Sequence, residues 1–291
     1  MENIKYRMNF LQNYDSNKIW LAPAKINHFL HITSQRQDGY HELQTVFQFL
    51  DYSDELRFKV LDHKEISHSN PLPGVAPEDD LTVRAATLLQ EYTNCLMGVQ
   101  ISINKRLPMG GGLGGGSSDA ATTLVALNQL WQLELKKFEL AELGVRLGAD
   151  VPIFIHGFTA WAEGVGEELS AVELKESWFV VLIPPVSIST AEVFSNSELK
   201  RNCLPISIDH FLSGEGSNVC EPIVRKLYPE VDSAITWLEQ FSKARMTGTG
   251  ACVFAAFASE QEAQQILSNR PKQFAGFIAQ GKNKSPLYSC V

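Results

Sequence analysis

A glycine-rich segment near the middle of the chain constrains the fold more than any other feature. Residues 110–118 read Gly-Gly-Gly-Leu-Gly-Gly-Gly-Ser-Ser. The preceding residues 99–104 predict a strand, and residues 119–131 predict a helix with Ser118 as its N-cap. Glycines let backbone N–H groups approach an anion closely, and a helix N-terminus adds further donors. The segment therefore predicts a phosphate-binding loop, with a flexible linker as the alternative.

Known phosphate motifs limit how this loop could bind a nucleotide. It is not a Walker A loop, because no Gly-Lys-Ser/Thr sequence follows the glycines. A GxGxxG pattern fits at Gly110, Gly112 and Gly115, but a run with so many glycines matches that pattern almost automatically. A dinucleotide fold would also place its loop directly after a strand, whereas residues 105–108 intervene here. A nucleotide-binding oxidoreductase is therefore a less favoured hypothesis.

The composition excludes several classes of partner. The chain has 291 residues and a formal net charge of -8, so it has no global positive field to attract a nucleic acid. No apolar stretch approaches the ~18 residues of a membrane span, and residues 1–19 contain no apolar core of a secretory signal. The five cysteines have no zinc-like spacing. We therefore expect a cytoplasmic protein with free thiols that binds neither nucleic acid nor membrane. We also expect a monomer or weak dimer, although no sequence pattern determines the oligomeric state.

Strands and helices are interleaved along the chain, but without the regular alternation of a parallel α/β sheet. The early strands form hairpin-like pairs, which favours an α+β fold. A charged, glycine-containing stretch at 166–177 is typical of a domain boundary. We expect a loosely docked or disordered extension at 1–19, one domain at 20–168 and a second at 169–291. The pattern predicts strands over 25–32, 54–60, 99–104, 178–183, 244–247 and 252–257, and helices over 82–92, 119–131, 138–147, 219–227, 231–241 and 260–268.

Several segments resemble the GHMP kinases, the superfamily of galactokinase, homoserine kinase, mevalonate kinase and phosphomevalonate kinase. The resemblance implies a two-domain α+β GHMP kinase fold, with an N-terminal domain like ribosomal protein S5 domain 2 and a ferredoxin-like C-terminal domain. It covers nearly the whole chain from Trp20 onward. The segments that carry it are 23–27, 108–118 and 246–254 for the three superfamily motifs, and 36–50, 148–152 and 162–167 for one branch of the superfamily.

That branch implies a reaction. Its members transfer the γ-phosphoryl group of ATP to the 2-hydroxyl of a cytidine diphosphate sugar alcohol in isoprenoid precursor synthesis. ATP with Mg²⁺ is the implied cofactor, and no dedicated metal site is certain, although Ser117 or Ser118 could contact the ion. Another GHMP kinase that acts on homoserine or mevalonate is the alternative, as is an inert phosphate sensor. The inert sensor would lack Lys25 or Asp150, and both are present.

The resemblance also assigns the catalytic residues. Taken alone, Asp150 would be interpreted as a turn or helix-end residue, and Lys25 as a strand lysine that extends to solvent. The resemblance instead makes Asp150 the base that accepts the proton of the attacking hydroxyl. It makes Lys25 the cation that keeps this carboxylate ionised and stabilises the charge of the transferring phosphoryl group.

The remaining site residues are assigned to the two substrates. The resemblance implies that Tyr40 and His41 lie at the cytidine end and that Asn27 contacts the erythritol. It also makes Phe194 a second aromatic wall, unless Phe194 is a core residue. Lys105 faces either the nucleotide or solvent. The full nucleotide set is Lys105, Pro108, Met109, Gly110, Gly111, Gly112, Leu113, Gly114, Gly115, Gly116, Ser117 and Ser118, and the acceptor set is Asn27, Tyr40, His41, Thr190 and Phe194.

Overall fold

A long antiparallel hairpin of β1 (Trp20–Gln35) and β2 (His41–Leu61) organises the molecule. The structure is a computed structural model that describes residues 15–37 and 39–290. The register of the hairpin shifts between Pro23 and Lys25, where a proline cannot donate to the ladder, and such a bulge re-aims the side chains that follow. Lys25 and Asn27, two residues apart on β1, therefore present their side chains on one face.

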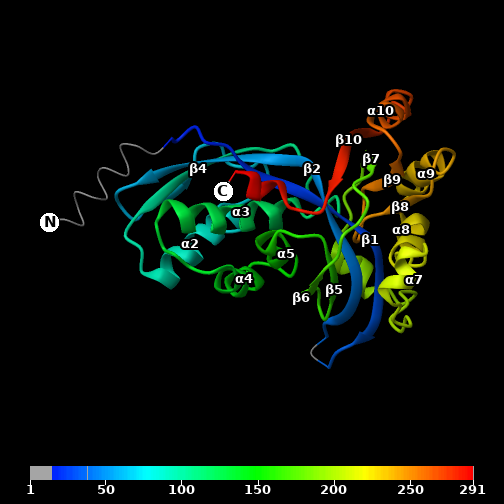
Figure 1. Ribbon diagram of the computed structural model, residues 1–291, viewed down its shortest axis with the longest axis horizontal. Helices are drawn as coiled ribbons and strands as arrows, with labels where there is room; N and C mark the ends of the chain where they lie inside the picture. Colours follow the sequence, from blue (N-terminus) through cyan, green and yellow to red (C-terminus); the bar gives the residue numbers. More distant parts are fainter. Residues whose placement is uncertain (1–14, 38, 291) are drawn as a thin grey trace.

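One half of the molecule packs four helices against this hairpin and β4 (Gly98–Asn104) (Figure 1). Leu124, Phe58 and Phe154 belong to its core and are fully buried. α3 contacts both α2 and α5 and lies between them beneath the sheet (Figure 1). These helices are α2 (Leu81–Thr93), α3 (Gly115–Leu130), α4 (Lys137–Val145) and α5 (Val151–His156).

The other half has its own core around Val180, Ile235 and Val253, between a small antiparallel sheet and outer helices. β10 joins the two halves, because Gly281 and Lys282 pair with β2 while residues 275–280 pair with β7. The main path of the sheet runs β3-β4-β2-β10-β7-β9-β8, where β3 is the short strand Ile66–His68. The elements of this half are β7 (Trp178–Ile183), α8 (Glu221–Leu227), α9 (Pro229–Leu238), β8 (Ala244–Met246), β9 (Val253–Phe257), α10 (Glu260–Ser268) and β10 (Ala275–Lys282).

Short elements complete the chain. They include η1 near the C-terminus, whose Leu287 is fully buried in the core of the first half. The chain thus returns to the first half after completing the second. These elements are β3 (Ile66–His68), β5 (Ala160–Glu163), β6 (Glu168–Ala171), α6 (Thr190–Ser195), α7 (Ile208–Leu212) and η1 (Pro286–Ser289).

The α+β class predicted from the sequence is confirmed, and several predicted boundaries were wrong. Ser118 is not the N-cap of α3. The helix begins at Gly115 with Gly114 as its cap, because the glycine run itself forms the first helical turn. The helices predicted at 219–227 and 231–241 begin at Glu221 and Pro229, in each case with a proline in the first turn, where its missing N–H costs nothing. The boundary between 168 and 169 stays a prediction, and most of the 1–19 extension lies outside the described residues.

Candidate active site

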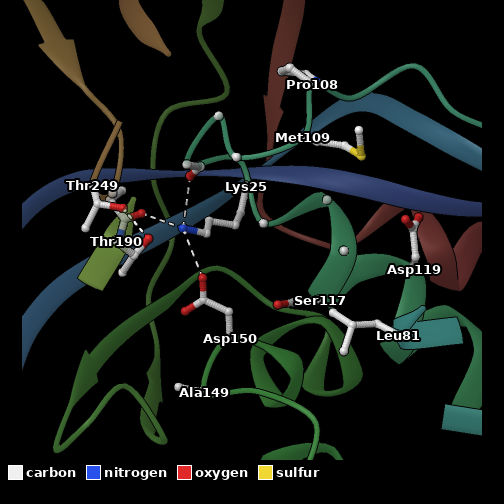
Figure 2. A pocket seen from close by; sticks show the side chains of 18 of the residues that line it. Lys25, Leu81, Pro108, Met109, Ser117, Asp119, Ala149, Asp150, Thr190 and Thr249 are labelled. Atoms are coloured by element: carbon white, nitrogen blue, oxygen red, sulfur yellow. Dashed lines mark hydrogen bonds and ion pairs between the residues drawn. The ribbon is translucent and has the colours of Figure 1, made fainter. Parts of the chain in front are cut away.

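A cavity of about 570 Å³ lies between the two halves of the molecule (Figure 2). The glycine loop forms one wall, and β1 with the segment before α5 forms another. The turn between β8 and β9 supplies Gly248, Thr249 and Gly250 from the second half. Segments separated by more than two hundred residues therefore meet around one space large enough for a small ligand.

The glycine loop needs glycine for steric reasons at specific positions. Gly110, Gly112 and Gly114 all have φ near +70°, a conformation that side chains rarely adopt. A Cβ on Gly112 would overlap the backbone oxygen of Thr247, so the loop and the β8–β9 turn could not approach as they do. The loop is fixed there by a hydrogen bond from the Thr247 hydroxyl to the Gly112 carbonyl (3.2 Å). The N-terminus of α3 follows directly and directs its free N–H groups at the same space.

Lys25 and Asp150 form an ion pair under this loop, with 3.3 Å between Nζ and Oδ2 (Figure 2). The Lys25 amine also donates to Asn27 Oδ1 (2.6 Å) and to the Gly112 carbonyl (3.2 Å). Asp150 precedes α5 but does not cap it with its side chain, so the carboxylate is available to Lys25. The Lys25 side chain is only 4% exposed, whereas that of Asp150 is 38% exposed. The carboxylate is thus accessible to a ligand while its cation is fixed.

The main contact of the Asn27 side chain within the site is with the Lys25 amine. Its Oδ1 accepts from the Lys25 amine, and its Nδ2 donates to Thr45 Oγ1 (3.0 Å). Its backbone N–H donates to Thr247 Oγ1 (2.9 Å), which couples β1 to the β8–β9 turn. Asn27 lines the cavity but is 4% exposed. The predicted contact of Asn27 with the acceptor stays a prediction, and the structure adds a role in orienting Lys25 that the sequence did not indicate.

Lys105 is bound by two carboxylates. Its amine lies 2.6 Å from Asp54 Oδ2 and 2.6 Å from Asp119 Oδ2. Asp54 also accepts hydrogen bonds from the backbone N–H groups of Arg106 and Leu107, which fixes the approach to the glycine loop. Burial raises the pKa of Asp119 to about 7 even though the charge of Lys105 opposes this shift. Lys105 and Asp119 both line the cavity, so this cluster forms part of its wall.

A second cavity of about 400 Å³ adjoins the first and shares Leu43, Ala149, Val165 and Phe194 with it. The rings of His41 and Phe194 stack at its edge, with 5.1 Å between centroids and 28° between planes. Tyr40 also lines this space and is 63% exposed. Aromatic faces of this kind suit a planar base.

The structure brings most of the predicted site residues together. Among the predicted nucleotide residues, Leu113 and Ser118 are not in the cavity wall, because both side chains are buried. Thr190 lines the larger cavity and hydrogen bonds Thr249 (2.9 Å). Sequence reasoning missed Asp54, Asp119, Thr45 and Thr247, whose importance depends on contacts across the fold. The individual roles of these residues stay predictions.

Comparison with known proteins defines the class. Residues 80–158 match the GHMP kinases N terminal domain, and residues 205–276 match the GHMP kinases C terminal domain. A homoserine kinase from Cytophaga hutchinsonii shares the fold at 18% identity, with a TM-score of 0.65 and coverage of 94% of this chain and 97% of that one. The chain therefore belongs to the GHMP kinases.

More similar relatives narrow the class. A 4-diphosphocytidyl-2-C-methyl-D-erythritol kinase of Nitrosococcus oceani is 56% identical over 273 residues, which is 94% of this chain and 98% of the relative. That of Shewanella halifaxensis is 55% identical over 92% of this chain and 95% of the relative. A crystal structure of 4-(cytidine 5'-diphospho)-2C-methyl-D-erythritol kinase is 30% identical with a TM-score of 0.79, covering 90% of this chain and 98% of that one. The chain belongs to the 4-diphosphocytidyl-2-C-methyl-D-erythritol kinase family, and these relatives do not favour the oxidoreductase hypothesis.

Proposed function

We propose that the chain is an ATP-dependent kinase that phosphorylates the 2-hydroxyl of 4-diphosphocytidyl-2-C-methyl-D-erythritol, a step of the non-mevalonate route to isoprenoids. The relatives carry this acceptor in their names. The observation that supports the proposal most is the Lys25–Asp150 pair beneath the glycine loop, next to a second cavity with stacked rings. One space suits a triphosphate and the other suits a base, so the hydroxyl to be phosphorylated lies between them.

The proposed chemistry uses Asp150 as the proton acceptor. Its carboxylate lines the cavity and is accessible, so it can hydrogen bond an acceptor hydroxyl and accept its proton as the phosphoryl group transfers. Lys25 holds this carboxylate on one side and offsets negative charge that develops on the transferring group. Asn27 and the Gly112 carbonyl hold the Lys25 amine in place, so little reorganisation is needed during the reaction.

The glycine loop binds phosphate in this proposal. Its backbone N–H groups and those at the start of α3 donate to the phosphate oxygens of ATP. Pro108 and Met109 line the part of the cavity beyond the loop, with Leu81 opposite, which gives an apolar space for the adenine (Figure 2). Binding of the nucleotide thus depends on residues that are mostly adjacent in sequence.

Mg²⁺ would supply charge neutralisation for the phosphates when it is bound with ATP. The available donors fit this ion, because the Ser117 hydroxyl and the Asp150 carboxylate line one cavity and Mg²⁺ prefers oxygen ligands. Within residues 15–37 and 39–290, no group of three or more His, Cys, Asp or Glu residues could hold a metal. We propose that phosphate oxygens and water would supply most of the ligands of this ion. Ser117, which lines the cavity, would contact the ion, whereas the Ser118 hydroxyl is buried outside the wall.

We also propose a partner, a cellular location and an oligomeric state for the enzyme. The partner is a small molecule, and the net charge of -8 disfavours nucleic acid. In the described part of the chain, no helix has the length and apolar character needed to cross a membrane. We place the enzyme in the cytoplasm as a monomer or weak dimer, and size-exclusion chromatography with light scattering can check its oligomeric state.

A panel of acceptors tests the proposal. ADP release would be measured with ATP, Mg²⁺ and either 4-diphosphocytidyl-2-C-methyl-D-erythritol, homoserine, mevalonate or galactose. We expect turnover with the cytidylyl acceptor alone. Turnover with homoserine or mevalonate would assign the chain to another GHMP acceptor. The absence of turnover with every acceptor would favour the inert phosphate sensor.

A further inference from the structure

We propose that Arg201 is a positioning residue for the acceptor's base: it joins His41 and Phe194 into one rigid wall and fixes which nitrogen of the His41 ring carries the proton. This inference rests on the function proposed above. Arg201 lies between α6 and α7, 160 residues from His41 in the chain. Arg201 is not among the described residues that line the two cavities. It therefore acts on a ligand through the residues that form the cavity walls.

The first observation is the number of acceptors around one guanidinium. Arg201 Nε donates to His41 Nε2 (3.1 Å). Its Nη1 donates to the carbonyl of Leu199 (3.2 Å). Its Nη2 donates to the carbonyls of Phe194 (2.6 Å) and Asn196 (3.0 Å). A planar guanidinium with five N–H donors in fixed directions can satisfy all four acceptors at once, and a lysine amine cannot.

The second observation is where these acceptors lie. Phe194 is on α6, and Asn196 is its C-cap, so Arg201 binds carbonyls that have no partner within the helix. A cation is also favoured at the negative end of a helix. His41 comes from the start of β2, at the turn end of the β1–β2 hairpin. One side chain therefore hydrogen bonds both members of the stacked pair, and it does so without lining either cavity.

The third observation concerns the His41 ring. A guanidinium only donates, so His41 Nε2 must accept, and in the neutral ring the proton then lies on Nδ1. Burial, and secondly the charge of Arg201, lower the pKa of His41, which keeps the ring neutral near pH 7. His41 thus offers an N–H donor to a ligand in the cavity that it lines. N3 of cytosine accepts a hydrogen bond, whereas N3 of uracil carries a hydrogen and would oppose this donor.

The kinetic test compares three variants. Arg201→Lys keeps the positive charge but loses the planar set of N–H donors, and Arg201→Met loses both. The control is Lys200→Met, which removes the charge of an exposed neighbouring residue. We expect the KM for the cytidylyl acceptor to rise at least about tenfold in both Arg201 variants. The KM for ATP and kcat should stay within about twofold of wild type, and Lys200→Met should match wild type throughout. An unchanged acceptor KM in Arg201→Met would overturn the proposal.

The spectroscopic test reads the tautomer directly. Long-range ¹H–¹⁵N correlation spectra of the whole protein at pH 7.5, with His41→Gln used for assignment, distinguish Nδ1–H from Nε2–H imidazole. We expect Nδ1–H for His41 in the wild type and in Lys200→Met, and a mixture of tautomers in Arg201→Met. Observation of Nε2–H in the wild-type protein would contradict the assigned role.

Two further outcomes distinguish a positioning role from a general structural role. If both substrates lose affinity equally in the Arg201 variants while the melting temperature falls, Arg201 supports the fold as a whole and the proposal is wrong. The wild-type protein is assayed first with the cytidylyl acceptor. Failure of that assay refutes the proposed function, whereas an active wild type with unaffected Arg201 variants refutes the present inference alone.

Discussion

The two ends of the site are built in different ways. The phosphate end is local in sequence: residues 108–117 line the cavity almost without interruption, and Lys25 is nearly fully buried beside them. The acceptor end joins an exposed tyrosine and a histidine of the β1–β2 hairpin to a phenylalanine more than 150 residues away. Geometry at the first end is set by backbone, and at the second by contacts between side chains. Substitutions at the two ends should therefore affect different kinetic constants.

The largest effect is expected at the ion pair. Asp150→Asn and Lys25→Met should each lower kcat by about 10²- to 10⁴-fold, the usual contribution of a positioned proton acceptor. The fold should survive in Lys25→Met, because Asp150 is 38% exposed and does not become a stranded buried charge. It should survive in Asp150→Asn because the buried Lys25 amine keeps Asn27 Oδ1 and the Gly112 carbonyl as acceptors. Steady-state kinetics and circular dichroism check both points. The matched control is Asp209→Asn at an exposed position of α7, and near-wild-type turnover in Asp150→Asn would remove Asp150 from its proposed role.

The next effect tests the backbone geometry of the phosphate end. Gly112→Ala should raise the KM for ATP at least about tenfold and lower stability by more than the ~1–2 kcal/mol that a left-handed residue costs. The added Cβ would overlap the Thr247 carbonyl, so the loop must move. Gly214→Ala is the control, since Gly214 has φ +102° but open space around it. Equal effects of the two substitutions on the KM for ATP would show that the close packing of the loop is unimportant.

A smaller and selective effect is expected at the acceptor end. Phe194→Leu keeps an apolar side chain on α6 but removes the ring that stacks on His41. Stacking of an aromatic on a base contributes about 1–3 kcal/mol, so the acceptor KM should rise by about fivefold to a hundredfold. The KM for ATP should not change. Phe138→Leu, at an exposed phenylalanine of α4, is the control. A parallel rise in the KM for ATP would contradict the separation of the two ends.

The remaining prediction concerns the pH dependence of stability rather than activity. The pKa of Asp119 is raised to about 7 in the fold by burial, above its value of 3.8 in the unfolded chain. The native state then binds more protons than the unfolded state between these values, so stability falls as pH rises from about 4 to about 7. The slope from one proton is at most ~1.4 kcal/mol per pH unit. Urea unfolding of the wild type and Asp119→Asn at pH 5, 6, 7 and 8 should show a smaller slope in the variant, and identical slopes would contradict this.

The same comparison explains what the sequence could predict. The strand, glycine loop and helix are contiguous, so the phosphate end followed from residue types and their order. The start of the helix was misplaced because a glycine is conventionally assigned to the loop, whereas Gly115 and Gly116 begin the helix here. Lys25 and Asp150 were predicted as a pair through the family resemblance, since 125 positions separate them in the chain.

The rest depends on long-range contacts that no local pattern records. Asp119 follows Ser118 at the start of a helix and reads as an ordinary first-turn carboxylate, yet it binds Lys105 together with Asp54. Arg201 lies in a segment without secondary structure and carries no motif. Its importance appears only when His41 and the end of α6 are placed beside it. Polar and charged residues whose partners come from distant parts of the chain are therefore the class that sequence reasoning missed.

The proposed reaction delivers the phosphoryl group to one particular hydroxyl. The product of a reaction with ATP and 4-diphosphocytidyl-2-C-methyl-D-erythritol would be examined by ³¹P NMR with proton coupling. The carbon that bears the 2-hydroxyl also bears the methyl group and has no hydrogen, so we predict a new phosphomonoester signal without vicinal proton coupling, alongside an intact diphosphate. A doublet or triplet from a phosphate on a neighbouring carbon, or no new signal at all, would contradict the account.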